Sequence, residues 1–184
     1  ECREAAERQQ RREDETHLRV YNQRLVMLHA IDQAILSDVA PESVCAYALR
    51  FLCVQMNVWG GEIVLFDTTT NEARVLATYR RTPESAEETT ADVYSMEAFT
   101  PQHFDKLSKG SPYYIPRLAD GVPVAFSAPL NGLSASYLSV PITGIDGLLG
   151  TMILLSDDDT GFSGEQRSTA AEVAHHLATA ISQG

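Results

Sequence analysis

The stretch SYLSVPITGIDGLLGTMILL, residues 136–155, constrains the fold more than any other part of this sequence. Two runs of apolar and β-branched residues flank a short glycine-containing turn, a pattern typical of a β-hairpin. We expect Asp146 and Gly147 to take the positive φ angles that a tight hairpin turn requires. Pro141 stands near the end of its run, where a missing backbone N–H costs least. We expect Gly150 to let a helix or a ligand approach the sheet closely.

Side chains of this hairpin should divide between two faces, because successive residues of a strand point to opposite sides of a sheet. One set is wholly apolar and is expected to pack as scaffold. The other combines an aromatic ring with a hydroxyl group and is the better candidate for a site. The mixed set is Tyr137, Ser139 and Pro141, and the apolar set is Leu138, Val140 and Ile142.

Residues 1–37 predict one long helix. The first sixteen residues hold few large apolar side chains, but from there apolar residues recur at spacings of three and four, on one helix face. Such a length is typical of a coiled coil or of a linker between domains, and a frayed terminal extension is the alternative. We expect a coiled-coil-like signalling helix whose first turns are solvated and whose second half packs. Its apolar stripe is Leu18, Tyr21, Leu25, Leu28, Ile31 and Ile35.

Two further long helices are predicted, one after Pro41 and one at the end of the sequence. Proline suits the first turn of a helix. The residues that follow, to about Asn57, are apolar on nearly all sides, as in a buried helix. Ser163 and Gln166 form a capping-box pattern ahead of the last helix. Its apolar residues recur at four-residue steps, so we expect it to pack against the first helix.

The middle of the sequence predicts short strands and one short helix. Thr100 can cap a two-turn helix that ends at Gly110. We expect 82–92 to be a loop and 119–134 a loop or short helix. Consecutive strands between terminal helices predict an α+β fold, with one antiparallel sheet and those helices on one face. The strand candidates are 61–67, 74–80, 93–99 and 112–118, the last bounded by prolines as an edge strand is.

Composition excludes several classes of function. A formal net charge of -11 argues against a nucleic-acid binder, which needs clustered Lys and Arg. No run approaches about 20 apolar residues, so neither a membrane span nor a signal peptide is predicted. Cys45 and Cys53 lie in one predicted helix about 12 Å apart, too far for a disulfide. Reduced, buried thiols favour a cytoplasmic protein.

The polar clusters give little support for catalysis or metal binding. Three adjacent carboxylates at 157–159 diverge and predict a solvated turn. His175 and His176 are helix neighbours, so they cannot chelate one ion together. His103 lies among aromatic residues, where it could touch a ligand or a haem iron, and a half-exposed helix residue is the alternative. The carboxylate and histidine patterns therefore predict no metal site. No nucleophile is paired with a base, so we expect no enzymatic activity either.

The order of these elements resembles a GAF domain, of the kind that follows a PAS domain in bacterial sensor histidine kinases. The resemblance runs through RLVMLHAIDQAIL, EIVLFDTTTNEARVLA, SYLSVPITGIDGLLGTMILL and GFSGEQRSTAAEVAHHLATAI. It implies a GAF-like, PAS-related sheet of six antiparallel strands, with the terminal helices on one face. A roof over the other face, from about residue 92 to 133, would enclose a small-ligand pocket. The signalling helix would span 1–37 and the GAF domain 38–184.

The resemblance also implies a function and a set of site residues. Such modules bind a small ligand or only dimerise, and pass signals through their terminal helices to PAS, kinase or other output domains of the same chain. Residues 82–135 contain no cysteine, so a covalently attached bilin is not expected, whereas haem or a small metabolite stays open. A purely structural dimer and a small enzyme such as a sulfoxide reductase are the alternatives. The pocket candidates are Phe99, His103, Phe104, Tyr114, Tyr137 and Ser139, and the stripe from Leu18 to Ile35 would form a homodimer.

Overall fold

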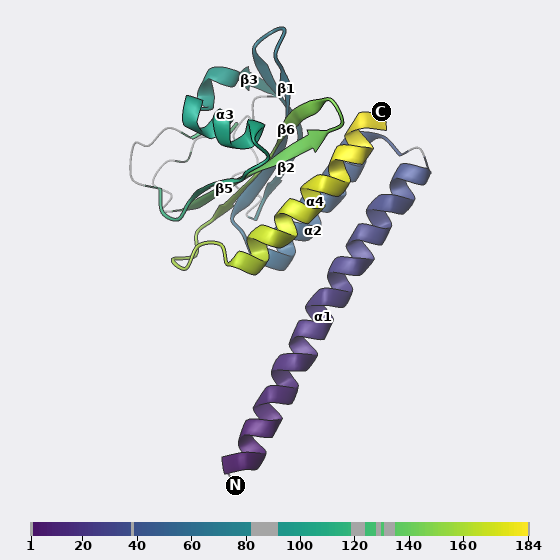
Figure 1. Cartoon of the computed structure of the whole chain (residues 1–184), viewed down its shortest axis with the longest axis vertical. Coiled ribbons are helices and arrows are strands. Elements are labelled where there is room, and N and C mark those ends of the chain that lie inside the picture. The colour runs from purple at the N-terminus through teal and green to yellow at the C-terminus, as the bar shows by residue number, and fades with distance from the viewer. Residues whose placement is uncertain are drawn as a thin grey trace.

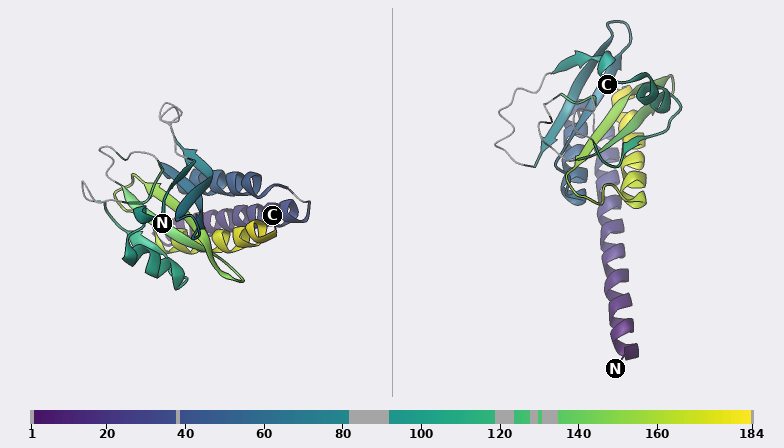
Figure 2. Two further views of the ribbon diagram at one scale, coloured as in Figure 1. Left: turned by 90° about the horizontal axis from the view of Figure 1, so that it is seen from above. Right: turned by 90° about the vertical axis from the view of Figure 1, so that its left-hand side faces the viewer.

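The structure is a computed structural model in which one sheet separates two layers (Figure 1). It describes residues 2–37, 39–81, 92–118, 124–127, 130 and 135–183. The predicted loop at 82–92 lies outside these residues except for Asp92, and only 124–127 and 130 of the predicted loop or short helix at 119–134 are described. Three long helices cover one face of the sheet, and a short helix lies over the other (Figures 1 and 2).

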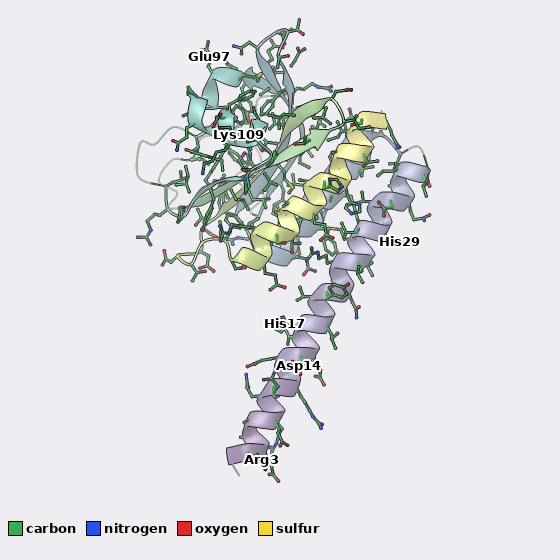
Figure 3. The ribbon with its side chains drawn as sticks, viewed as in Figure 1. Arg3, Asp14, His17, His29, Glu97 and Lys109 are labelled. Carbon is green, nitrogen blue, oxygen red and sulfur yellow. The ribbon has the colours of Figure 1, made fainter. Side chains whose placement is uncertain are left out.

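Helix α1 (Cys2–Leu36) confirms the predicted long helix and extends well beyond the rest of the molecule (Figure 1). Its first half is polar and held by contacts one turn apart, such as Arg3 with Glu7. Figure 3 shows Arg3, Asp14 and His17 on this projecting part. The second half packs, and Met27 and Ile31 are fully buried.

Helices α2 and α4 complete the helical layer. Pro41 opens α2 (Pro41–Met56), which ends where Asn57 takes a left-handed φ of 51°. The predicted capping box opens α4 (Gly164–Gln183): Ser163 Oγ accepts from the Gln166 N–H at 3.1 Å, and Gln166 Oε1 accepts from the Ser163 N–H at 2.9 Å.

Helix α4 packs against α1, as predicted, and polar contacts also join the two helices. Arg24 forms an ion pair with Glu172, and His176 Nδ1 lies 3.1 Å from Asp32 Oδ1. His175, next along α4, is exposed. No helix in the described ranges has both the length and the apolarity that crossing a membrane requires.

The six strands form one antiparallel sheet in the order β3-β2-β1-β6-β5-β4. Two hairpins, β1–β2 and β5–β6, meet along a central seam where β1 pairs with β6. The predicted strand at 93–99 is wrong after its third residue, because Ser95 Oγ accepts from the Glu97 N–H and starts a 3₁₀-helix, Met96–Ala98. The strands are β1 (Gly60–Asp67), β2 (Glu72–Arg80), β3 (Val93–Ser95), β4 (Tyr113–Ile115), β5 (Ser136–Gly144) and β6 (Gly147–Ser156).

The β5–β6 hairpin forms as predicted, with two differences in its glycine-rich part. Only Gly147 has a positive φ, 119°, so the expectation for Asp146 was wrong. A Cβ at Gly150 would lie 2.0 Å from the carbonyl oxygen of Val64. The group that approaches Gly150 is therefore the backbone of β1, neither a helix nor a ligand.

The sheet has a distinct apolar core on each face. Leu138, Val140 and Ile142 face the three long helices, as predicted from the alternation. Tyr137 faces the opposite way, toward α3 (Pro101–Ser108), whose N-terminus Thr100 caps through the His103 N–H. The face under α3 therefore combines apolar packing with the polar side chains described next.

Candidate functional site

The sheet face opposite the long helices carries an aromatic cluster around His103. This side chain projects from α3 and is almost completely buried. Its ring stacks on Tyr113 of β4, with centroids 4.2 Å apart and planes at 16°. Phe99 lies at 5.0 Å and Tyr137 meets the imidazole edge-on at 5.8 Å. Aromatic residues of β4, of β5 and of the segment ahead of α3 thus surround one histidine.

Five of the six predicted pocket residues lie on this face. Phe99, His103, Tyr137 and Ser139 come together, and Phe104 lies beside them against Phe66, at 5.7 Å. The sixth, Tyr114, does not join them.

Tyr114 lies on the helix-facing side, so its assignment to the pocket was wrong. It pairs with Leu138 across the β4–β5 ladder, whereas Tyr113 pairs with Ser139. Cross-strand partners share a face, which makes Tyr113 the residue that reaches the cluster. The Tyr114 hydroxyl instead accepts the backbone N–H of Phe162 at 3.1 Å, ahead of α4.

A chain of buried hydrogen bonds runs from His103 into the sheet. His103 Nε2 lies 2.8 Å from Ser139 Oγ, which lies 2.7 Å from Thr151 Oγ1. Thr151 Oγ1 donates to the carbonyl of Val140 at 2.9 Å. Each hydroxyl has one proton, so Ser139 donates to Thr151 and His103 Nε2–H donates to Ser139. The serine proton is directed away from the imidazole, an arrangement that does not activate Ser139 as a nucleophile.

Burial determines the charge state of His103. Loss of solvent around the imidazole lowers the pKa of His103 from 6.5 to about 4, so the ring is neutral at pH 7. With its proton on Nε2, the neutral ring keeps its acceptor lone pair on Nδ1. While the hydrogen bond from Nε2 to Ser139 is present, His103 can therefore accept a hydrogen bond or ligate a metal only through Nδ1.

Glu62 of β1 is a buried acid on the same face that sequence reasoning missed. It is fully buried, and its carboxylate accepts from Tyr94 Oη at 2.9 Å and from the N–H and hydroxyl of Ser127 at 3.2 and 2.5 Å. Burial raises the pKa of Glu62, and the hydrogen bonds from Ser127 and Tyr94 oppose that rise. The sequence does hold one indication of it. Glu62 is a single acid in the apolar run GEIVLF, two residues before Val64, which faces the same side of the sheet as the aromatic cluster.

The predicted dimer stripe divides into two halves. Leu18, Tyr21 and Leu25 are 62%, 55% and 45% exposed. Leu28 and Ile31 are buried against the chain's own domain. The expectation that the whole stripe pairs with a second copy was therefore wrong for its second half, since those side chains already have partners.

The acidic residues 157–159 lie in an exposed turn ahead of α4, as predicted. Asp157 forms an ion pair with Arg81, and Asp158 accepts from the Thr160 N–H at 2.9 Å in a turn. Among the residues that the structure describes, no three His, Cys, Asp or Glu side chains are arranged to hold a metal ion.

Comparisons with known proteins place the chain. A family model described as a GAF domain matches residues 38–182. The GAF domain of an Acinetobacter phosphoenolpyruvate-protein phosphotransferase is similar, with a TM-score of 0.66 and 17% identity over 86% of this chain and 92% of its own. The equivalent domain from Coxiella burnetii has a TM-score of 0.65 and 15% identity, over 87% and 93%.

A phycoerythrobilin-bound GAF domain from a cyanobacterial phytochrome is also similar, with a TM-score of 0.68 and 14% identity over 87% of this chain and 95% of its own. No curated protein matches the sequence. The solved structures support the six-stranded α+β fold, and the family model covers most of the chain, so this chain belongs to the GAF domain family.

Proposed function

We propose that this GAF domain is a regulatory sensor module, without catalysis of its own, that binds a small ligand non-covalently on the face around His103. The observation that supports this most is the combination of buried polar groups with aromatic rings on one sheet face. Small-ligand sites are mainly apolar, with a few placed polar groups that fix orientation. His103 and Glu62 are such groups.

The strands offer a route from this face to the terminal helices. Ser139 belongs to the His103 chain, while its neighbour Val140 packs in the core against α4. Thr151 and Met152 stand in the same relation on β6. A ligand that shifts β5 would therefore shift the surface on which α4 rests, and α1 packs on α4. It transmits a signal only if it favours one arrangement of those helices.

The proposed ligand classes are haem and small metabolites. The cyanobacterial relative is a phycoerythrobilin-bound domain. The absence of cysteine between residues 82 and 135 favours a non-covalent mode here. A haem iron would meet the Nδ1 of His103, because Nε2 carries the proton donated to Ser139.

Titration of the full chain with haemin tests the tetrapyrrole class. Haem on His103 should give a shifted Soret band, and His103→Gln should weaken binding at least about tenfold, as expected when a ligand-contacting group is lost. His29→Gln is the matched control, since His29 is exposed on α1 (Figure 3). Equal affinities of the two variants would contradict the haem proposal. Native mass spectrometry of the chain purified from cytoplasm tests the metabolite class by an added mass.

We further propose a homodimer formed through the exposed half of α1, in the cytoplasm, within a chain that also carries PAS and kinase or other output domains. An isolated helix is marginal in water, and Leu18, Tyr21 and Leu25 of α1 are left exposed. Sedimentation of the full chain should show a dimer that Leu18→Glu with Leu25→Glu disrupts. Val54→Glu is the control, because Val54 is equally exposed but lies on α2. A dimer that persists in the double variant would contradict this interface.

A further inference from the structure

Residues 124–127, here called the strap, cross the site face and are tied to three different strands. The Tyr137 hydroxyl of β5 donates to the carbonyl of Ala125 at 2.9 Å. The Arg80 guanidinium of β2 lies 4.4 Å from the ring centroid of Phe126. Ser127 donates twice to Glu62 of β1. Three consecutive strap residues thus use three separate sheet side chains.

The Glu62 contact differs in kind from the other two. A fully buried carboxylate is costly unless hydrogen bonds replace the water it has lost. Of the three donors that reach it from the described residues, two belong to one strap residue and the third is Tyr94 Oη. Removing Ser127 would leave the acid under-bonded, or let water reach it. Glu62 and the strap therefore depend on each other.

Arg80 adds a second buried ionisable group to the same contact. Its guanidinium also lies over the ring of Trp59, 5.5 Å from the centroid, and donates to the Tyr79 carbonyl at 2.9 Å. Its Nη2 is buried and makes no hydrogen bond to the part of the chain that the structure describes. Burial lowers the pKa of Arg80, and nearby Glu62 opposes that shift. When the strap moves away, water can hydrate both Glu62 and Arg80 Nη2. This hydration reduces the free energy needed to release the strap.

We infer that Glu62 is the latch of a movable strap: the structure is the latched state, and release of Ser127 from Glu62 uncovers the aromatic face. The latch follows from the contacts alone, and its use as an entry gate for a ligand rests on the proposed function. Tyr137 and Arg80 hold the strap through a single hydrogen bond and a stacking contact. Glu62 holds it through two hydrogen bonds from Ser127 to a buried side chain that has lost its water, and so controls its release.

Hydrogen exchange of the full chain, without any ligand, tests the latch. The Ser127 N–H is bound to Glu62, so exchange of a peptide covering 124–127 reports the open fraction. Glu62→Met removes both strap bonds and should speed exchange there by about 100-fold, and Ser127→Ala, which removes one, by about tenfold. Glu62→Gln should stay within about threefold, because its oxygen can accept from Ser127 while its amide donates to Tyr94 Oη.

Asp67→Asn is the matched control, since it neutralises an acid at the exposed end of the same strand and should leave strap exchange unchanged. Local acceleration in Ser127→Ala, with β5 and β6 still protected, supports the latch even if Glu62→Met unfolds. Wild-type exchange of the strap in Ser127→Ala, or equal acceleration in all strands, would overturn it. Because no ligand is present, a failure to bind haemin would contradict the proposed ligand class and leave this result standing.

Discussion

Two buried ionisable groups on one sheet face should give the domain opposite responses to acid. His103 has a folded pKa of about 4 against an ordinary 6.5, so the unfolded chain takes up this proton first as the pH falls. Its contribution to stability is complete above about pH 6.5 and is lost as the pH falls toward 4. Glu62 has a raised folded pKa. Its contribution is complete below its unfolded pKa and is lost as the pH rises through its folded value.

The size of the histidine effect follows from its shift. At about pH 4.5 the unfolded chain is almost fully protonated at this site and the folded chain only partly, which costs about 2–3 kcal/mol relative to pH 7.5. The contribution of Glu62 to the free energy of unfolding increases over part of the same fall in pH. The stability of the wild type therefore depends less on pH than either residue alone would make it. Exposed carboxylates with lowered pKa values, such as Asp67, lose their contribution only at still lower pH.

Urea unfolding of the full chain between about pH 4.5 and 7.5 separates the two residues, with two-state behaviour checked by two probes. The free energy of unfolding of the wild type, relative to that of His103→Gln, should fall by about 2–3 kcal/mol as the pH is lowered from about 7.5 to 4.5. Glutamine keeps an N–H donor for Ser139, so the comparison isolates the charge. Glu62→Gln should show a steeper acid loss than wild type. A pH-independent difference between wild type and His103→Gln would refute a buried, neutral His103.

Three further predictions concern the scaffold. Gly150→Ala should lower the free energy of unfolding by about 3 kcal/mol or more in urea titration, because its Cβ would collide with the rigid carbonyl of Val64. Met27→Ala should cost about 2–4 kcal/mol in the same assay, since a fully buried side chain of α1 leaves a cavity. Burial raises the pKa of both the Cys45 and Cys53 thiols to about 12, so neither should react with a thiol reagent at pH 8 until urea unfolds the chain.

The fold could be predicted because its signals are local. The alternation in residues 136–155, the proline that opens α2 and the capping box at Ser163 each depend on a few neighbouring residues. Their order along the chain then restricts the fold to one sheet with the terminal helices on one face. The 3₁₀-helix after Ser95 was missed because a single side-chain bond to the backbone ends the strand there.

The site could be predicted only in part, because register and partners are not local properties. Tyr113 and Tyr114 are identical residues in a short strand, and only the pairing with Ser139 decides which one reaches His103. Glu62 is an ordinary acid in the sequence, and its importance comes from Ser127, far along the chain. The stripe on α1 was read correctly as apolar, but the sequence does not say that its second half is covered by the domain itself.

The central seam of the sheet has a consequence for how the chain reaches its native state. Each hairpin closes a short loop, whereas β1 and β6 join Gly60 to Leu155 across most of the domain. Closing so large a loop costs entropy before any contact is gained, and distant pairings of this kind slow folding. We expect the two hairpins to form early and the seam to close last. Pulsed hydrogen exchange during refolding should then protect the amides of β1 that bond to β6 after those that bond to β2. Gly150, which fits the β1 backbone only without a side chain, stands at the point where the two halves of the molecule must find their register.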